Sequence, residues 1–363
     1  MKKIVFIVPS INKVGGAQKM AKFVIDSVFN DAKHEVFLVP QQKSRDELSF
    51  NNNVSIIHLK HNINGPIPRL KRMVIRLLAT CEIRRIVRSL SPDLIVIFGI
   101  TSSSLLALKG KRYNKVYCER GDPFSYPKYL QKLLKKSVQD YRALILQSEG
   151  AKSFFTFFSN DKMRVIPNPC LVDSPPTYGG NFDSQILISA GRFVSEKRFD
   201  FIIEAFFELK KRYRDLVLRI YGDGEERENL LQLISEKGLE KSVYLFSGTN
   251  DLLKEISKAK LFLFASTFEG LPNVVIESCG IGIPCVCTNC SPGGVDYLTE
   301  SGKVGGKMVG IDDFYGFVNA CSDLIENKNE YLHYSISGVA FRKRFNKKVI
   351  ITKWRNAFSD IVD

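Results

Sequence analysis

Phe262-Leu-Phe-Ala-Ser-Thr-Phe-Glu-Gly-Leu-Pro-Asn-Val-Val-Ile-Glu277, followed shortly by Pro284-Cys-Val-Cys287, is the stretch that decides the fold of this chain. The short apolar run that ends at Phe264 predicts a buried strand, and Pro272 stands where the first turn of a helix is expected. The second apolar run predicts the next strand. A strand, a helix and a strand in this order are typical of parallel α/β layers.

The same alternation of short apolar runs and helical patterns extends over the whole sequence, in two series. The first series predicts strands at Ile4–Val8, Glu35–Val39, Val54–Ile57, Leu94–Phe98, Lys115–Cys118, Ala143–Leu146 and Arg164–Ile166. The second predicts strands at Gln185–Ser189, Val217–Tyr221, Val243–Phe246, Leu261–Phe264, Pro284–Cys287 and Lys307–Val309.

A stretch rich in proline and glycine separates the two series. We therefore expect an N-terminal domain over 1–172, a linker over 173–183, a C-terminal domain over 184–345 and a final helix over 346–363. Each domain is expected to be a doubly wound α/β unit. Such sheets bind ligands at the carboxyl ends of their strands, and two facing units create a cleft.

The composition is that of a globular protein. The 363 residues suffice for two cores, and 44% hydrophobic with 25% charged residues excludes a disordered or collagen-like chain. No apolar run is long enough to cross a bilayer. The run Ile4–Val8, ended by Pro9, is too short for a signal peptide, so we interpret it as a buried first strand of a cytoplasmic protein.

The positive charge is confined to one half of the chain. Residues 1–175 hold 29 Lys and Arg against 13 Asp and Glu, whereas residues 176–363 hold 24 against 25. Such asymmetry predicts an acidic partner for the N-terminal half, either nucleic acid or anionic lipid.

The eight cysteines offer a second possible chemistry. Cys287 and Cys290 form a Cys-Thr-Asn-Cys unit, which is half of a zinc site or a redox pair. A second pair of ligands is missing and the four histidines do not cluster in sequence. The alternative is that these cysteines are small, buried, reduced strand residues, and we expect no metal.

Two loops could bind phosphate. Gly15 and Gly16 lie between the first strand and an amphipathic helix, where backbone amides can approach a phosphate, although a plain tight turn fits equally. Arg192 and Lys197 follow the strand Gln185–Ser189, where they could clamp a diphosphate or form a solvated basic loop.

The loop after Phe264 carries the sharpest candidate site. Free amides near 270–274 at the start of a helix favour an anion, and Glu277 projects from that helix one turn after Asn273. A carboxylate there suits sugar hydroxyls better than phosphate. The alternative is that Glu269 and Glu277 are ordinary surface charges.

The two glutamates, with seven residues between them, resemble the Glu-x7-Glu signature of the retaining family-4 glycosyltransferases. The surrounding motifs are similar to this family in the same order along the chain. They are Val14-Gly-Gly-Ala-Gln, Ile166-Pro-Asn-Pro, Ser189-Ala-Gly-Arg-Phe-Val-Ser-Glu-Lys-Arg-Phe-Asp200, Ile220-Tyr-Gly-Asp-Gly224, Phe246-Ser-Gly248 and Gly282-Ile-Pro-Cys-Val-Cys287.

The resemblance implies the GT-B fold, two facing Rossmann-like domains with a last helix that crosses back to the first. It also implies a UDP-sugar donor on the C-terminal domain and an acceptor on the N-terminal one. Catalytic roles are implied for Glu269, Arg192 and Lys197. The implied donor contacts are Gly15, Gly16, Arg192, Lys197, Gly248, Thr249, Glu269, Gly270, Leu271, Pro272, Asn273, Val274 and Glu277. Two cations that neutralise the leaving diphosphate would make a metal unnecessary.

Two segments depart from the usual family pattern. Tyr117-Cys-Glu119-Arg120-Gly121-Asp122-Pro123 replaces a common histidine segment and is similar to members that act on lipid-linked saccharides. We expect a catalytic Glu119 that reaches the donor sugar or the acceptor, with Arg120 near a phosphate, and we expect Arg120 and Asp122 to contact the acceptor or the sugar; the alternative is a buried ion pair. Asp296 stands where relatives often carry glutamate, so a sugar contact by Asp296 is a further expectation.

The positive charge of the N-terminal half suits a protein that binds a membrane surface. The segment 69–90 has an apolar side, with Arg72, Arg76, Arg84, Arg85 and Arg88 over much of the rest, and the lysines of 128–136 share a face. We expect these surfaces to dock on the cytoplasmic leaflet and meet a polyprenyl-diphosphate-linked acceptor of surface polysaccharide synthesis; solvated surface helices are the alternative.

Three other functions remain open. A nucleotide-sugar epimerase of the same fold would use other carboxylate and histidine patterns. A nucleic-acid-binding protein would leave the C-terminal motifs unused, so we expect no nucleic-acid partner. An NAD enzyme would need the missing Gly-x-Gly-x-x-Gly.

Overall fold

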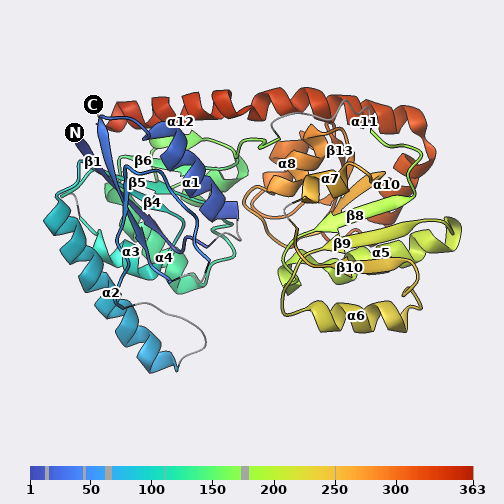
Figure 1. Cartoon of the computed structure of the whole chain (residues 1–363), viewed down its shortest axis with the longest axis horizontal. Helices are drawn as coiled ribbons and strands as arrows, with labels where there is room; N and C mark the ends of the chain where they lie inside the picture. The colour runs from blue at the N-terminus through green and yellow to red at the C-terminus, as the bar shows by residue number, and fades with distance from the viewer. Residues whose placement is uncertain are drawn as a thin grey trace. The chain divides into compact units, whose positions relative to one another are not determined.

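The computed structural model describes residues 1–12, 16–43, 46–61, 68–110, 112–172, 180–249 and 251–362. The chain divides into two compact units (Figure 1). Unit 1 comprises Met1–Asn168 together with Lys348–Asp363, and unit 2 comprises Pro169–Lys347.

Unit 1 contains a seven-stranded parallel sheet in the order β3-β2-β1-β4-β5-β6-β7. Its strands are β1 (Lys2–Val8), β2 (His34–Pro40), β3 (Val54–Ile56), β4 (Leu94–Phe98), β5 (Lys115–Cys118), β6 (Ala143–Leu146) and β7 (Met163–Val165). All seven strands expected from the sequence are present, with ends shifted by at most two residues at either end.

Burial on both faces explains why these strands are continuous apolar runs. Along β1, Ile4, Phe6 and Val8 belong to one buried cluster, while Val5 and Ile7 belong to a second cluster on the opposite face. Successive side chains of a strand point to opposite faces, so both faces of this sheet must be covered.

Helices cover the two faces of the unit 1 sheet. The helices of this unit are α1 (Gly16–Val28), α2 (Arg69–Leu90), α3 (Ser102–Ala107), α4 (Lys128–Ser137) and α12 (Lys347–Val362). α1 and α12 contribute to the cluster of Ile4, and α2, α3 and α4 contribute to the cluster of Val5.

α12 returns the C-terminal segment to unit 1, as the resemblance implied. Its residues Ile350, Trp354, Ala357 and Phe358 recur at helical spacing and are buried. Trp354 stacks on Phe98 at the end of β4 with ring centroids 6.2 Å apart.

Unit 2 contains a six-stranded parallel sheet in the order β10-β9-β8-β11-β12-β13. Its strands are β8 (Ile186–Ala190), β9 (Val217–Tyr221), β10 (Val243–Phe246), β11 (Leu261–Phe264), β12 (Cys285–Thr288) and β13 (Gly306–Val309). Its helices are α5 (Phe199–Arg212), α6 (Arg227–Glu236), α7 (Leu252–Ile256), α8 (Asn273–Gly280), α9 (Gly294–Thr299), α10 (Phe314–Glu326) and α11 (Lys328–Phe341). Both units are Rossmann-like α/β folds, which confirms the expected fold class.

The units divide at different residues from the expected domains. Unit 2 begins at Pro169, because Cys170 is buried in its core and the backbone N–H of Cys170 donates to the carbonyl of Phe345 at 2.7 Å. Of the expected linker 173–183, residues 173–179 lie outside the described residues, and the rest belongs to unit 2. In the described part of the chain, no helix combines the length and apolar character that a membrane span requires.

Candidate active site

The carboxyl end of β8 positions the two expected cations. The strand ends at Ala190, and the backbone of Phe193 donates to the carbonyl of Asp223, which fixes the loop against the end of β9 at 2.9 Å. A short 3-10 turn, Ser195–Lys197, then leads into α5. Arg192 extends outward with 65% of its side chain exposed and lies 3.9 Å from Glu196, whereas Lys197 is only 16% exposed.

Lys197 and Glu269, which are 72 residues apart in sequence, form an ion pair in which Lys197 Nζ donates to Glu269 Oε2. The Glu269 side chain is 26% exposed, and the ring of Phe264 lies 5.8 Å from the ammonium. The fold therefore brings together two of the residues expected to be catalytic. A partly buried pair of this kind is screened less by solvent than a pair on the surface.

The loop that carries Glu269 is held from two sides. On one side, the backbone N–H and the hydroxyl of Thr267 both donate to the carbonyl of Glu196, at 2.9 and 3.1 Å. On the other, the backbone N–H of Glu269 donates to the carbonyl of Ser291 at 2.8 Å. The backbone of Gly294 lies so close that an added Cβ would be 2.3 Å from the carbonyl oxygen of Gly270.

The glycine-rich turn at Cys290–Gly294 supports the Glu269 loop, a role that the sequence analysis did not predict. The signal was the pair Gly293-Gly294 at the start of a helix. Gly293 has a φ of +89°, which favours glycine, and Gly294 is required by the close backbone approach.

The start of α8 provides the expected anion-binding geometry. The helix begins at Asn273. Pro272 is the N-cap residue and makes no side-chain capping hydrogen bond, and Leu271 before it is buried. The first N–H groups of a helix attract negative charge. Val274 lies in this first turn, and Glu277 follows one turn later. Burial, with the nearby Glu277 carboxylate as a further contribution, raises the pKa of Cys170.

Gly248 and Thr249 lie in the loop after β10. The backbone N–H of Gly248 donates to Asp223 Oδ2 at 2.8 Å, and the Thr249 hydroxyl accepts from the backbone of Asp251 at 3.1 Å. Asp223, which sequence reasoning did not single out, therefore joins the loops after β9 and β10. Its signal was its position between the two glycines of Gly222-Asp-Gly224.

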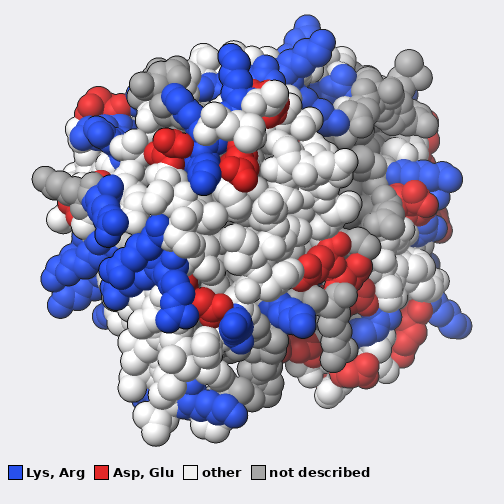
Figure 2. All heavy atoms as spheres, turned by 60° about the vertical axis from the view of Figure 1, so that its left-hand side comes forward, with Lys and Arg blue, Asp and Glu red and all other residues white. Residues whose placement is uncertain are grey.

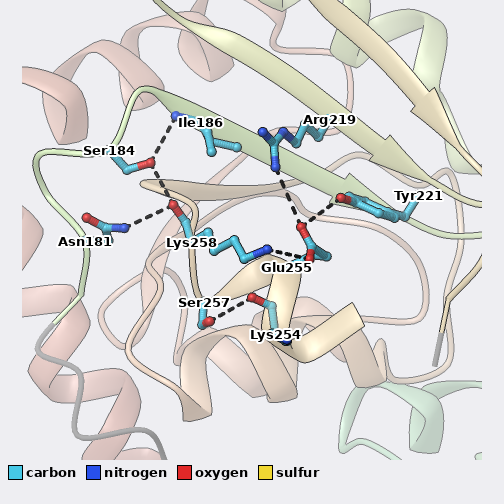
Figure 3. A network of polar contacts seen from close by, with 9 residues as sticks. All are labelled: Asn181, Ser184, Ile186, Arg219, Tyr221, Lys254, Glu255, Ser257 and Lys258. Atoms are coloured by element: carbon cyan, nitrogen blue, oxygen red, sulfur yellow. Dashed lines mark hydrogen bonds and ion pairs between the residues drawn. The ribbon is translucent and has the colours of Figure 1, made fainter. Parts of the chain in front are cut away.

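A polar network supports the strand end beside this loop (Figure 3). Glu255 accepts a hydrogen bond from the Tyr221 hydroxyl at 3.1 Å and pairs with Arg219 at 3.6 Å and with Lys258 at 2.6 Å. The Tyr221 ring stacks on Phe246 with centroids 4.9 Å apart. The hydrogen bond from Lys258 outweighs burial and lowers the pKa of Glu255, so α7 anchors the end of β9 through a charged carboxylate.

The remaining candidates lie in both units. Gly15 lies outside the described residues, and Gly16 is the first residue of α1. Asp296, in unit 2, accepts from the Ser301 hydroxyl at 2.9 Å and so serves the turn after α9.

Glu119 is 1% exposed and its carboxylate accepts four hydrogen bonds. Oε1 accepts from the Tyr126 hydroxyl and from the backbone of Arg120 and Gly121, and Oε2 accepts from the Tyr117 hydroxyl at 2.7 Å. Four donors occupy the usual acceptor capacity of a carboxylate. Burial raises the pKa of Glu119, against the lowering effect of these hydrogen bonds. In this arrangement Glu119 holds its own loop through three bonds at Oε1 and one at Oε2, and the contact with sugar or acceptor stays a prediction.

Arg120 lies against two aromatic rings. Its guanidinium carbon is 4.5 Å from the centroid of Phe98 and 5.0 Å from that of Trp354 in α12, and Nη1 is 3.5 Å from Asn168 Oδ1. Asp122 is 3% exposed and accepts from the backbone of Phe124 at 2.9 Å, which closes a turn. The side chains of Glu119 and Arg120 do not form the alternative, a buried ion pair: the carboxylate accepts from tyrosine hydroxyls and backbone N–H groups, and the guanidinium lies against aromatic rings and Asn168.

Comparison with known proteins identifies the unit that carries Lys197 and Glu269. Residues 177–337 match the family model described as "Glycosyl transferases group 1". The chain contains a group 1 glycosyltransferase domain. An uncharacterized glycosyltransferase of Haemophilus influenzae is 28% identical over 98% of this chain and 99% of its own length.

A second relative and a solved structure are also similar to this chain. The N-acetylgalactosamine-N,N'-diacetylbacillosaminyl-diphospho-undecaprenol 4-alpha-N-acetylgalactosaminyltransferase of Campylobacter jejuni is 31% identical over 45% of this chain and 43% of its own length. The structure of Anabaena HepE, solved with UDP and glucose, superimposes with a TM-score of 0.74 at 17% identity, over 99% of this chain and 100% of that one. This structural likeness shows the GT-B fold.

The cysteines of the glycosyltransferase are free thiols. All eight are free, and every one except Cys81 is buried, including Cys287 and Cys290. Among the described residues, no group of three or more His, Cys, Asp and Glu side chains could hold a metal ion. The expectation of buried strand residues is confirmed for Cys287 in β12, whereas Cys290 is buried in the loop that follows this strand.

We predict that one thiol reacts rapidly with Ellman's reagent in the native glycosyltransferase and that all eight react after denaturation. Cys81 is the exposed thiol. Burial raises the pKa of Cys118 and of Cys290 to about 12, so both stay protonated and unreactive near pH 8. Cys81→Ser should abolish the rapid phase, and a rapid phase that survives this substitution would contradict the prediction.

We predict that Glu119→Ala destabilises unit 1 by about 2–4 kcal/mol, because it leaves buried donors without an acceptor. Glu119→Gln keeps one carbonyl acceptor and should cost less than half as much. The single tryptophan, Trp354, packs on this unit, so its fluorescence during urea unfolding measures the change. Equal midpoints for both variants and the wild type would show that the four hydrogen bonds contribute little.

Proposed function

We propose that this glycosyltransferase moves a hexose or N-acetylhexosamine from a UDP-sugar to a polyprenyl-diphosphate-linked saccharide, with retention of the anomeric configuration. The observation that carries the proposal is the Lys197–Glu269 pair at the carboxyl edge of the unit 2 sheet, beside the start of α8. Open α/β sheets bind ligands at this edge.

The chemistry demands stabilisation of a leaving diphosphate. When the anomeric bond breaks, the sugar becomes oxocarbenium-like and negative charge grows on the diphosphate. Lys197, Arg192 and the first amides of α8 oppose that charge. Glu269 holds Lys197 in the ligand-free protein and, in our proposal, hydroxyls of the sugar in the complex. Glu277 bonds the ribose, and the loop of Gly248 and Thr249 lies near the base.

The proposed acceptor side belongs to unit 1. The relative in Campylobacter jejuni is named for a diphospho-undecaprenol substrate, and HepE was solved with UDP and glucose. These names support a UDP-sugar donor and a lipid-linked acceptor here, in bacterial surface polysaccharide synthesis. In this proposal the departing phosphate oxygen accepts the proton of the acceptor hydroxyl, and neutralisation by Arg192 and Lys197 removes the need for a metal.

We further propose that unit 1 associates with the cytoplasmic face of an anionic membrane rather than with nucleic acid. In Figure 2, which brings the left-hand side of Figure 1 forward, Lys and Arg side chains gather at the lower left with few Asp and Glu side chains among them. Each exposed cation near anionic lipid contributes roughly 1 kcal/mol, an effect that fades with salt.

A donor screen tests the proposed reaction. A panel of UDP-sugars is incubated with a synthetic polyprenyl-diphosphate saccharide, with and without EDTA, and products are identified by mass spectrometry. We expect one UDP-sugar to extend the acceptor equally well in both conditions. Isomerised UDP-sugar without extension would favour the epimerase, and binding to RNA or DNA filters at physiological salt would favour a nucleic-acid-binding protein.

A further inference from the structure

The first turns of α2 carry a stripe of apolar side chains that no described residue of unit 1 covers. The stripe comprises Leu70, Met73, Val74, Leu77 and Leu78, which are 71%, 55%, 47%, 55% and 42% exposed. Their spacing of three and four residues places them on one side of the helix. Scattered apolar residues on a surface are ordinary, but a continuous stripe of this kind marks an interaction site.

The length of α2 explains why this stripe is uncovered. A helix of 22 residues is about 33 Å long, whereas the five residues of β4 span about 17 Å. The second half of α2 packs on the sheet through Ala79, Ile83 and Val87. The first half therefore extends beyond the sheet, and Figure 1 shows these turns projecting from the other elements of unit 1.

The exposed stripe is not a continuation of the face that packs on the sheet. At about 100° per residue, the stripe lies roughly 150° around the helix from Ala79, Ile83 and Val87. Helix α2 needs only one apolar face to pack on the sheet, so the exposed stripe on its other side has a different partner. Periodicity in the sequence showed these residues on one side, but it could not show that the side is uncovered.

The charges beside the stripe identify that partner as an anionic surface. Arg69, Lys71, Arg72 and Arg76 lie in the same three turns, and the sequence contains no Asp or Glu between 68 and 81. An apolar stripe with a cationic opposite side is typical of helices that lie in the interface of a bilayer, with the stripe in the acyl region and the cations at the headgroups. A protein partner would not need this excess of one charge.

A second element presents matching residues at the same edge of the sheet. Both α2 and α4 connect a strand end to the next strand of the parallel sheet, so both begin at its carboxyl edge. At the start of α4, Phe124 and Tyr129 are 46% and 57% exposed beside Lys128. Aromatic rings next to lysines are enriched where proteins meet the headgroups of a membrane.

We propose that the first three turns of α2 insert their apolar stripe into an anionic lipid bilayer, with the start of α4 as a second contact. The inference rests on the proposed membrane association and deepens it, because it names the inserting element. The loop Glu119–Asp122 follows β5 at the same edge. Insertion therefore brings the edge that would bind the acceptor to the surface in which a lipid-linked acceptor resides.

Vesicle co-sedimentation at rising salt tests insertion. We compare the wild type with the triple variant Leu70→Gln, Met73→Gln and Leu77→Gln, which leaves every charge in place. The matched control is Tyr315→Gln with Ile336→Gln, two unit 2 side chains that are 74% and 65% exposed. Vesicles contain phosphatidylglycerol and phosphatidylcholine. We expect the triple variant to lose affinity at least about tenfold and the control to match the wild type.

Three outcomes would overturn the inference: a triple variant that binds like the wild type, an equal loss in the control, or a wild type that does not bind at physiological salt. A wild-type dimer that the triple variant converts to a monomer, with unchanged vesicle binding, would assign the stripe to a second copy instead. Trp354 fluorescence in urea verifies folding. UDP binding, measured by calorimetry, tests the proposed function separately. We expect equal affinity in all variants, and a wild type that does not bind UDP would count against the proposed function.

Discussion

Lys197→Ala is expected to lower kcat about 100- to 1,000-fold, the usual cost of removing one preplaced group that stabilises charge in a transition state. The Lys197 side chain is 16% exposed and its ammonium pairs with Glu269, so water replaces this cation poorly. Steady-state kinetics with the UDP-sugar found in the donor screen measure the change. Binding of UDP should weaken much less, because the charge on the diphosphate is greatest as the bond breaks.

The control for this prediction is Lys211→Ala. Lys211 lies in α5, downstream of Lys197, and pairs with Glu208 on the surface with 58% of its side chain exposed. We expect wild-type kinetics for this variant. Lys197→Ala with more than half of the wild-type kcat, in a folded protein, would remove Lys197 from the site. Because Lys197 and Glu269 form one unit, Glu269→Ala and the double variant should not have additive effects.

Gly294→Ala is expected to have the second large effect, although local preference favours alanine in a helix by about 1 kcal/mol. The new Cβ would lie 2.3 Å from the carbonyl oxygen of Gly270, and a backbone atom cannot move aside as a side chain can. Unit 2 should lose about 1–3 kcal/mol of stability. Displacement of the Glu269 loop should lower kcat/KM about 100-fold.

Calorimetric unfolding and donor kinetics test this substitution against Gly310→Ala. At Gly310 the nearest atom to an added Cβ is the Cβ of Asp313 at 3.4 Å, so alanine fits there. We expect Gly310→Ala to resemble the wild type in both measurements. Unchanged kinetics for Gly294→Ala would mean that the contact between these two loops does not position the site.

The limits of inference from the sequence are clearest at particular residues. The strands were predictable because burial on both faces leaves an apolar run such as Ile4–Val8, which stands out against its neighbours. Because the ends of the strands could be predicted, the sequence also placed Arg192, Lys197 and Glu269 just beyond strand ends. Glu119 was harder, because its four donors include Tyr126, seven residues away, whose direction depends on the path of the loop.

The sequence alone determined two parallel α/β units, a group of charged residues at their strand ends and an excess of positive charge in the N-terminal half. These features depend on local periodicity and composition, which short segments express by themselves. Only the tertiary structure decided that Lys197 pairs with Glu269, that Gly294 contacts Gly270, and that the apolar stripe of α2 is uncovered. Each of these depends on which distant segments approach one another, and packing sets that approach.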